Sequence, residues 1–430
     1  MRYPHEEIQQ RLIGLSDDTS FVLGAAILAR RHVLIRGKHG CGKSTFCRIA
    51  ARYLGLRSDE WQYYDASKDD LVSVAGIPDV RSFAGGPDDS ESHHAGLKFL
   101  AHRRTIWNKK MVMIDEITRA SPESQNIWLE VVGNRSLFGQ PLPYEFLVAT
   151  CNPSTYTATY ELDDALLDRF AIVCDFPSLD EIPSYLLPDL VLVNMERTAE
   201  EDAGDAHFER SIIMKRFAAA RAELMNDADV RDAIVEWSSS VATVFLREKE
   251  RWSDCRVDSP TPRTIAEHLA RVGVDLIAYD AITRSQLGGA ALADCAIKMV
   301  LGQRLQWPEG LVDAVERRCS PVIAGIVDGP LSRHLRVVLG LRPREIFAAE
   351  DSFEYLVAHR AELSDNDRFY IEMSFRKLLS AYEDAPDGIE WLEHYASILA
   401  PSVARDMELE RVVSRVREYV DGNEMRREPH

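Results

Sequence analysis

The sequence predicts an α/β fold, in which a doubly wound parallel sheet is followed by an α-helical lid and an all-α C-terminal extension. Two observations predict the sheet: apolar runs of strand length alternate with helical patterns, and several of these runs end in polar side chains. A third predicts the extension, because from about Pro308 onward the chain keeps a helical pattern, broken only by turns. The expected strands are Val33–Ile35, Trp61–Asp65, Met111–Glu116, Tyr144–Thr150 and Ile172–Phe176.

Length, charge and cysteine usage narrow the class of protein. The 430 residues exceed what one hydrophobic core usually organises, so two or three domains are expected. Lys and Arg number 51 against 69 Asp and Glu, and the formal charge of -18 disfavours a broad grip on nucleic acid, although it leaves room for a local basic lining. Seven cysteines without a C-x-x-C pair favour neither disulfides nor a zinc site. The N-terminal segment MRYPHEEIQQ lacks a secretory apolar core, and no later run is long enough to span a bilayer, so we expect a cytoplasmic protein without membrane insertion.

A glycine-rich loop follows the first expected strand. The segment GKHGCGKS, Gly37–Ser44, matches the pattern G-x-x-x-x-G-K-[ST] between a strand and a helix. Glycines let backbone N–H groups close around phosphate oxygens, Lys43 is expected to reach the β- and γ-phosphates, and the Ser44 hydroxyl to ligate Mg²⁺. Short patterns also match by chance, so the alternative is a glycine-rich turn after a buried strand. The expected nucleotide-binding residues are Gly37, Lys38, His39, Gly40, Cys41, Gly42, Lys43, Ser44 and Thr45.

Polar side chains at the ends of two later strands complete the expected phosphate site. Asp115 and Glu116 follow the apolar run MVMI, and the carboxyl ends of strands are where open α/β sheets bind ligands. Asp115 is expected to act on Mg²⁺, and Glu116 to orient and polarise an attacking water. Asn152, released after another apolar strand, is expected to hydrogen-bond a water or the γ-phosphate. The alternatives are a helix cap for the acid pair and a turn residue before Pro153 for Asn152.

Four segments in this order, GKHGCGKS, MVMIDEITRASP, VATCNP and DALLDRF, resemble the AAA+ ATPases, and within them the MoxR-like group. The resemblance covers roughly residues 10 to 285, and the ordered set is far more specific than any single motif. It implies that Asp115 and Glu116 are the Walker B acids and that Asn152 is the sensor 1 residue. It also implies that Arg169 is an arginine finger that reaches a neighbour's nucleotide. Arg263, in SPTPRTIAEHL, matches the sensor 2 arginine at the start of a lid helix.

The resemblance extends to two insertions, and two departures accompany it. Asp70–Gly96 matches the insert in the second helix, and Gly133–Pro143 the hairpin before sensor 1. His39 and Cys41 stand where the family usually has Pro and Thr, and the chain reads LDDALLDRF where LPEAQLDRF is commoner. The expected domains are an AAA+ nucleotide-binding core over 1–195, a helical lid with sensor 2 over 196–300, and an all-helical C-terminal extension over 301–430.

Beyond the core, helical periodicity predicts the individual lid helices. These are expected over Arg210–Met225, Asp229–Lys249 and Pro262–Tyr279. In the extension, aromatic residues are expected to lie in the core and not on a recognition surface. Examples are Phe353, Tyr355, Phe369 and Trp391.

The reaction that the resemblance implies is hydrolysis of ATP with Mg²⁺. An arginine supplied by a neighbour implies a homo-oligomeric ring, a hexamer by family resemblance. Members of the group remodel or activate client proteins, often through a von Willebrand A domain partner, so the first interpretation is a chaperone-like ATPase. A second interpretation is the NTPase motor subunit of a DNA-processing or restriction complex, and a third is a nucleotide switch without hydrolysis, against which Glu116 argues. The sequence leaves open the client, the ring size and whether Arg263 acts on its own or a neighbour's nucleotide.

Overall fold

The structure is a computed structural model that divides into two compact units. Unit 1 consists of Met1–Leu287 and Leu292–Val315, and unit 2 of Gly288–Ala291 and Glu316–His430. The predicted three-part division at residues 195 and 300 stays a prediction. None of the helices in the described ranges is both long and apolar enough to cross a bilayer. The residues that the structure describes are 2–79, 99–152, 160, 162–196, 206–252, 257–285, 287–341, 346, 349–380 and 386–406.

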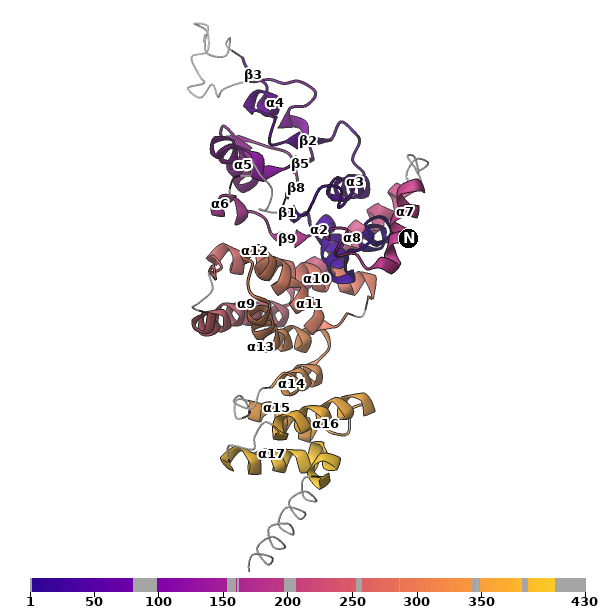
Figure 1. Cartoon of the computed structure of the whole chain (residues 1–430), viewed down its shortest axis with the longest axis vertical. Helices are drawn as coiled ribbons and strands as arrows, with labels where there is room; N and C mark the ends of the chain where they lie inside the picture. Colours follow the sequence, from indigo (N-terminus) through magenta and orange to yellow (C-terminus); the bar gives the residue numbers. More distant parts are fainter. Residues whose placement is uncertain are drawn as a thin grey trace, which may run out of the picture. The chain divides into compact units, whose positions relative to one another are not determined.

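Unit 1 contains a five-stranded sheet in the order β2-β5-β8-β1-β9, in which every neighbouring pair is parallel. Helices α3 (Lys43–Tyr53) and α5 (Pro122–Asn134) flank this sheet on opposite sides (Figure 1). The predicted doubly wound α/β core is therefore confirmed, with small shifts at the strand ends. Its strands are β1 (Val33–Arg36), β2 (Trp61–Asp65), β5 (Met111–Asp115), β8 (Phe146–Cys151) and β9 (Ile172–Asp175).

The central strands are buried because their residues are apolar at consecutive positions. All of β8 and the first four residues of β5 are buried, which is typical of a parallel sheet covered on both faces. The register pairs Arg36 with Cys151 and Asp65 with Asp115, so the ends of β1, β2, β5 and β8 are level with one another. The segments that follow these strands therefore leave the sheet at one edge.

Two short hairpins border the sheet. Strands β3 (Ile77–Pro78) and β4 (Phe99–Leu100) pair antiparallel, and the insert residues 80–98 between them lie outside the described residues. The predicted hairpin before sensor 1 is confirmed, with strands β6 (Ser136–Leu137) and β7 (Gln140–Pro141). The loose stretch from Asp70 differs from prediction, because it begins with helix α4 (Leu71–Ala75), whose N-cap Asp70 accepts a hydrogen bond from the Ser73 amide.

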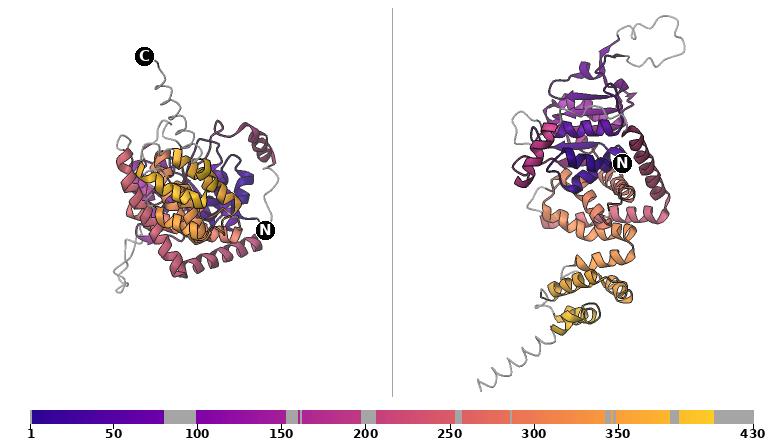
Figure 2. Two further views of the ribbon diagram at one scale, coloured as in Figure 1. Left: turned by 90° about the horizontal axis from the view of Figure 1, so that it is seen from below. Right: turned by 90° about the vertical axis from the view of Figure 1, so that its right-hand side faces the viewer.

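The remaining helices of unit 1 include the predicted lid helices, shown from two further directions in Figure 2. The third predicted lid helix is realised as a π-helical stretch, η6 (Thr264–Leu269), that continues into α10 (Ala270–Thr283). The other helices are α1 (Pro4–Arg11), α2 (Asp17–Ala29), α6 (Asp164–Leu167), α7 (Leu187–Glu196), α8 (Ala206–Asn226), α9 (Ala228–Lys249), the π-helical η7 (Lys298–Gly302) and α12 (Gln303–Leu305). Single 3₁₀ turns are η2 (Ile106–Asn108), η3 (Ile117–Arg119), η4 (Ser184–Leu186) and η5 (Glu250–Trp252). Two further helices, α11 (Gly289–Ile297) and α13 (Glu309–Val327), include residues assigned to both units.

Unit 2 is helical where the structure describes it, which confirms the all-α extension. Its helices α14 (Pro330–Leu339), α15 (Glu350–Ala358), α16 (Asp365–Ser380) and α17 (Pro386–Leu399) enclose their own apolar core. Phe353 is fully buried in this core, as predicted. The prediction for Phe369 is wrong, because its side chain is 57% exposed on α16. The side chain of Trp391 lies outside the described part of the chain.

Candidate active site

The glycine-rich loop joins β1 to α3, and glycine is favoured at three of its positions by backbone angle or by close packing. Gly40 and Gly42 adopt φ of +81° and +96°, in the left-handed region that favours glycine. A Cβ on Gly37 would lie 2.6 Å from the Cys41 sulfur. Helix α3 starts directly after this turn at Lys43, so its positive end faces the loop. The predicted strand–loop–helix arrangement is therefore present.

Lys43 connects the loop to the end of β8. Its side chain is 7% exposed, and Nζ donates to the carbonyl oxygens of Gly37 at 2.5 Å and Lys38 at 3.0 Å. The third contact is to Oδ1 of Asn152, at 3.2 Å, and Asn152 is itself 4% exposed. A buried ammonium group beside the loop is thus anchored entirely by oxygen atoms, the kind of partner that a phosphate also offers.

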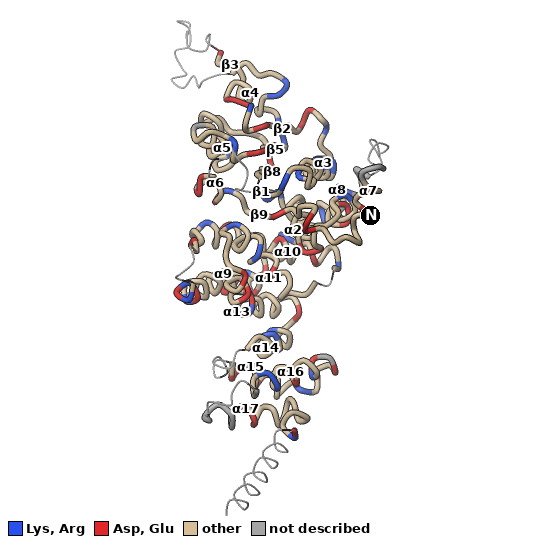
Figure 3. Tube along the Cα trace, viewed as in Figure 1, with Lys and Arg blue, Asp and Glu red and all other residues tan. Residues whose placement is uncertain are grey.

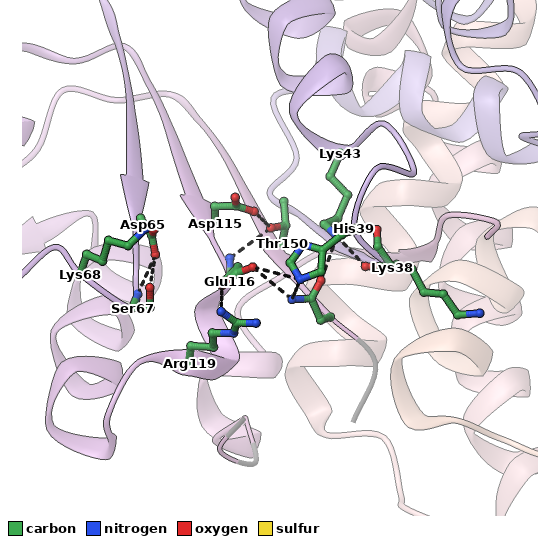
Figure 4. A network of polar contacts seen from close by, with 12 residues as sticks. Lys38, His39, Lys43, Asp65, Ser67, Lys68, Asp115, Glu116, Arg119 and Thr150 are labelled. Carbon is green, nitrogen blue, oxygen red and sulfur yellow. Dashed lines mark hydrogen bonds and ion pairs between the residues drawn. The ribbon is translucent and has the colours of Figure 1, made fainter. Parts of the chain in front are cut away.

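Asp115, at the end of β5, is held by two hydroxyl groups. The Thr150 hydroxyl donates a short hydrogen bond to Oδ1, and the Tyr63 hydroxyl donates to Oδ2 at 2.6 Å. Thr150 Oγ1 also accepts the backbone N–H of Glu116 at 3.2 Å, so one hydroxyl links both acids to β8 (Figure 4). The pKa of Tyr63 is raised, first by burial and then by its hydrogen bond to the Asp115 carboxylate. The phenol therefore keeps its proton and remains a donor to Asp115.

Glu116 turns away from the strand axis and meets the loop. Its backbone has φ of +54°, uncommon for a residue with a side chain and frequent at functional sites. Asn152 Nδ2 donates to Glu116 Oε1 at 3.2 Å, and His39 Nε2 of the loop lies 3.6 Å from the same oxygen. The other oxygen pairs with Arg119 Nη1 at 2.8 Å. Figure 4 shows Glu116 between Arg119 on one side and His39 of the loop on the other.

Asp115 influences the ionisation of two cysteines in and after the loop. Burial raises the pKa of the Cys41 thiol, the nearby Lys43 charge opposes this, and the Asp115 charge adds to it. Burial also raises the pKa of Cys47 on α3, with Asp115 as the second cause. Asp115 therefore lies within electrostatic range of both the loop and the first turns of α3, and the raised values keep both thiols protonated.

The residues predicted to hold Mg²⁺ fit that ion. Ser44 is exposed at the start of α3, and the Asp115 carboxylate is oriented by two donors. Mg²⁺ in nucleotide sites takes one or two protein oxygens together with phosphates and waters, so it needs no dense cluster of protein ligands. In keeping with this, the described residues contain no group of three or more His, Cys, Asp or Glu side chains arranged for a metal. The remaining predicted loop residues differ in exposure: Lys38 is exposed and pairs with Asp180, and Thr45 is buried on α3.

Arg169, predicted as the finger, lies in the turn after α6 and rests on α5. A Cβ on Gly133 would lie 2.5 Å from Arg169 Nε and 3.1 Å from Arg169 Cδ, so the arginine crosses α5 where that helix has no side chain. Arg169 Nε is buried and has no hydrogen-bond partner among the described residues.

Arg263, predicted as sensor 2, lies beside the residue that precedes Arg169. Its Nη1 is 3.7 Å from Asp168 Oδ2, and its Nε is 3.7 Å from Glu267 Oε2. Lys43, Asp115, Glu116 and Asn152 are thus brought together with His39, whereas the contacts of Arg263 lie with a different pair of acids. The two predicted arginines are therefore close to each other in the chain's fold.

Comparisons with known proteins bear on the same residues. Residues 32–172 match the family model of the ATPase family associated with various cellular activities (AAA). The uncharacterized protein YeaC of Bacillus subtilis is 29% identical over 185 residues, which are 41% of this chain and 52% of YeaC. Protein MoxR of Methylorubrum extorquens is 28% identical over 212 residues, 47% of this chain and 58% of MoxR. The chain carries an AAA+ ATPase domain of the MoxR-like group.

The alignments set the extent of this assignment. They span little more than half the length of the two relatives, so the match concerns the domain and not whole proteins. A crystal structure from Cytophaga hutchinsonii aligns with a TM-score of 0.46 at 16% identity, over 70% of this chain and 85% of its own. The match to the AAA family model covers β1, β2, β5 and β8 and ends at Ile172, the first residue of β9.

Sequence reasoning missed three residues of this MoxR-like site. The sequence predicts Tyr63 only as part of a strand, although a position near the end of β2, beside β5, also suits a partner of Asp115. Thr150 precedes the predicted sensor 1 residue by two positions, and the pattern predicts it only as the end of a strand. Gly133 is predicted as the start of a hairpin, and no local signal indicates that Arg169 packs against it.

Proposed function

We propose that this chain is an ATPase that uses Mg²⁺ and the Lys43–Asn152–Glu116 network to hydrolyse ATP. The observation that carries the proposal is this network, in which Asn152 contacts the loop lysine through Oδ1 and the second Walker B acid through Nδ2. A single amide thus ties a phosphate-binding cation to the group that directs water. The AAA+ membership of the domain supports the same reaction.

Each residue has a distinct part in the proposed hydrolysis. Lys43 exchanges its contacts with protein oxygens for contacts with the β- and γ-phosphates, because a compact ammonium group suits either partner. Glu116 orients the attacking water and accepts its proton, while Asn152 fixes that water relative to the γ-phosphate. Ser44 and Asp115 would hold Mg²⁺, which when bound neutralises charge on the phosphate oxygens.

Arg169 supplies positive charge on the side of the phosphate opposite Lys43 in this proposal, and it does so for an adjoining protomer. Arg263 has its contacts beside Asp168, next to Arg169, and this supports action on the same neighbouring nucleotide. A ring of identical chains, each sharing its site with the next, follows, with a hexamer expected by family resemblance. An arginine finger is worth on the order of 10³ or more in rate, so assembly would switch the enzyme on.

ATP turnover by the purified full chain tests the hydrolysis. We expect multiple turnovers with Mg²⁺, and loss of turnover with retained ATP binding in Glu116→Gln. The Lys43→Ala variant is the matched comparison, because it should lose the binding of ATP and not only its turnover. Equal loss of binding in both variants would contradict the roles, and a single turnover at most in the unmodified chain would indicate a nucleotide switch.

The use of the hydrolysis is proposed to be remodelling or activation of a client protein, directly or through a von Willebrand A domain partner. Exposed apolar side chains around the two hairpins support a protein client, namely Val72, Ile77, Leu100 and Phe138. Lys and Arg are interspersed with Asp and Glu along the described trace (Figure 3), and such a mixture attracts a nucleic-acid backbone less than a continuous basic surface would. Proteins retained by a Glu116→Gln chain with ATP, and absent with Lys43→Ala, would identify the client. ATP hydrolysis stimulated by DNA in a strongly salt-dependent way would favour the motor of a DNA-processing complex instead.

A further inference from the structure

Side chains from a single later segment surround the carboxylate of Asp168, the residue before Arg169. Its Oδ1 accepts hydrogen bonds from the hydroxyls of Thr261 at 2.8 Å and Thr264 at 2.6 Å. Arg304 Nη1 lies 3.6 Å from Oδ1, and Arg263 Nη1 lies 3.7 Å from Oδ2. The Asp168 side chain is 15% exposed, so these groups, all from residues 261–304, largely enclose it.

The backbone next to this carboxylate is held by the same segment. His268 Nε2 lies 2.8 Å from the carbonyl oxygen of Asp168, and Arg304 Nη1 donates to the carbonyl oxygen of Leu167 at 3.3 Å. Because a carbonyl only accepts, the His268 proton resides on Nε2. Burial, the largest cause, and the Arg304 charge lower the pKa of His268 to about 4, so the ring is neutral near pH 7. Residues of the later segment thus contact both the Asp168 side chain and the main chain of the turn that leads into Arg169.

Four of the residues that contact the turn lie in or just before the π-helical stretch η6. Thr264 and His268 are four positions apart within η6, and Thr261 and Arg263 lie just before it. A π-helical stretch is rare and frequently occurs at functional positions. The stretch follows directly after Arg263, the predicted sensor 2 residue, so Thr261, Arg263 and Thr264 at the start of this lid helix all contact one carboxylate.

Arg304 makes the arrangement costly to disturb. Its side chain is 1% exposed, and its Nε and Nη2 are buried without a hydrogen-bond partner among the described residues. Burial lowers the pKa of Arg304 to about 10, and the Asp168 charge opposes that effect. A buried guanidinium needs a counter-charge, and Asp168 is the carboxylate within reach of it. The position of Asp168 is therefore tied to the position of η7 and α12 as well as η6.

We propose that Asp168 is a positioning residue that joins the helical lid to the arginine finger, so that the lid of one protomer sets how far its Arg169 reaches into the next protomer's site. This inference rests on the proposed ATPase function with shared sites. When the lid moves with nucleotide, the contacts at Thr261, Thr264 and Arg304 carry the turn with it. Arg169, whose side chain rests on Gly133 of α5, then pivots against a fixed helix.

Mixtures of full-length variants test the inference. Asp168→Ala alone should bind ATP within about twofold of the unmodified chain and turn it over about 10- to 100-fold more slowly, because its finger is misplaced. Mixing it with Lys43→Ala, which cannot bind ATP but has an intact finger, should raise the rate above either variant alone. Mixing it with Arg169→Ala should not raise the rate, because both variants then lack the same half of the site. Asp168→Asn, which keeps the shape of the side chain, replaces Asp168→Ala if that variant does not fold.

The outcomes separate this inference from the proposed function. Recovery in the Lys43→Ala and Arg169→Ala mixture, without recovery in the Lys43→Ala and Asp168 mixture, overturns the inference and leaves the shared site intact. Recovery in the Asp168 and Arg169→Ala mixture, or an unchanged rate in the Asp168 variant alone, also overturns it. If Lys43→Ala and Arg169→Ala themselves fail to complement, the shared site is wrong and the inference fails with it.

A matched variant controls for general destabilisation. Asp275 is a buried carboxylate on α10 that pairs with Arg31 at 2.5 Å and Arg221 at 2.7 Å. Asp275→Asn removes a comparable charge from two arginines in the same unit. It should lower the thermal unfolding temperature as Asp168→Asn does, while its turnover per folded chain stays within about twofold of the unmodified protein. Equal loss of turnover in both variants would assign a merely structural role to Asp168.

Discussion

Two clusters in unit 1 differ in how their charges are balanced. The phosphate-loop cluster, Lys43, Asp115, Glu116 and Asn152, is closed on itself, since its side chains contact one another or donors from adjoining strands. In the arginine cluster, Asp168, Arg169, Arg263 and Arg304, two guanidinium groups, those of Arg263 and Arg304, lie near the Asp168 carboxylate. Arg263 also lies near Glu267, whereas Nε of Arg169 has no hydrogen-bond partner among the described residues. The side chains of the first cluster thus satisfy one another, and the second contains an arginine whose Nε is left unsatisfied.

In the proposed hydrolysis, the two clusters are complementary halves of one reaction centre. A transferring γ-phosphoryl group needs positive charge on several sides, and Lys43 with Mg²⁺ would supply only one of them. Arg169 of the arginine cluster would supply another. Changes in the first half should alter nucleotide or metal binding, whereas changes in the second should alter the rate after binding.

Removal of the finger should have the largest effect on rate. We expect Arg169→Ala to lower kcat by about 10³-fold while ATP affinity stays within about twofold, because in the proposed shared site the arginine acts after binding and in another protomer. Steady-state kinetics with a direct binding assay measures both. Arg376→Ala in unit 2, which breaks the Arg376–Asp406 ion pair, is the matched control and should leave kcat unchanged. A large loss of ATP affinity in Arg169→Ala would place the arginine in the first half.

Loss of the Tyr63 hydroxyl should weaken the binding of Mg²⁺. Tyr63→Phe removes one of the two donors to Asp115, and such supporting groups typically matter about 10-fold in metal affinity. We therefore expect the Mg²⁺ concentration for half-maximal activity to rise by about that factor. Tyr64→Phe is the control in the same strand, because its hydroxyl donates to the carbonyl oxygen of Arg104. Equal shifts in the two variants would rule out a specific role for Tyr63.

The substitution Gly133→Ala, which adds a methyl group to α5, should lower kcat without lowering the free energy of unfolding. Gly133→Ala places a Cβ against the far end of the Arg169 side chain, which can move at little cost. Alanine favours a helix over glycine by about 1 kcal/mol, so the unfolding free energy should hold or rise. The displaced arginine should lower kcat several-fold, by about 5-fold. Unchanged kcat in a folded Gly133→Ala protein would show that the seat of Arg169 on α5 is irrelevant to catalysis.

Acid should destabilise the folded chain, with the smallest effect near neutral pH. Burial, the largest cause, lowers the pKa of His32 from 6.5 to about 3, and that of His268 from 6.5 to about 4. The unfolded chain takes up protons at these histidines before the folded chain does, so stability is complete above pH 6.5 and falls as the pH drops towards 3. His32→Gln should flatten the dependence of the unfolding free energy on pH over this window. An unchanged slope in denaturant titrations at several pH values would contradict the assignment.

That the residues of the phosphate-loop cluster lie close together could be predicted from the sequence, because each of them directly follows a recognisable apolar strand. Gly37–Ser44, Asp115–Glu116 and Asn152 each follow an apolar strand, and strands of one parallel sheet end at one edge. Their convergence could be inferred without coordinates. The doubly wound sheet was accessible for the same reason, since each strand is a short apolar run between helical patterns.

The contacts within the arginine cluster could not be predicted from the sequence in this way. Arg304 reaches Asp168 and Leu167 only because a much later segment folds back onto this turn. The contact between Arg304 and Leu167 joins residues 137 positions apart, and no periodicity encodes such a contact. Gly133 looks like any glycine near a helix end until Arg169 is seen against it. The error at Phe369 has a related cause, because helical spacing indicates that one face is apolar but not whether another element covers it.

Complementation between Lys43→Ala and Arg169→Ala chains tests the central claim most directly. Each variant alone should be nearly inactive, the first for want of bound ATP and the second for want of a finger. In equal mixture within a ring, about one quarter of the sites should join an intact loop to an intact arginine, and ATP turnover should rise to about that share of the unmodified rate. No rise at any mixing ratio, with both variants shown to assemble together, would contradict the account.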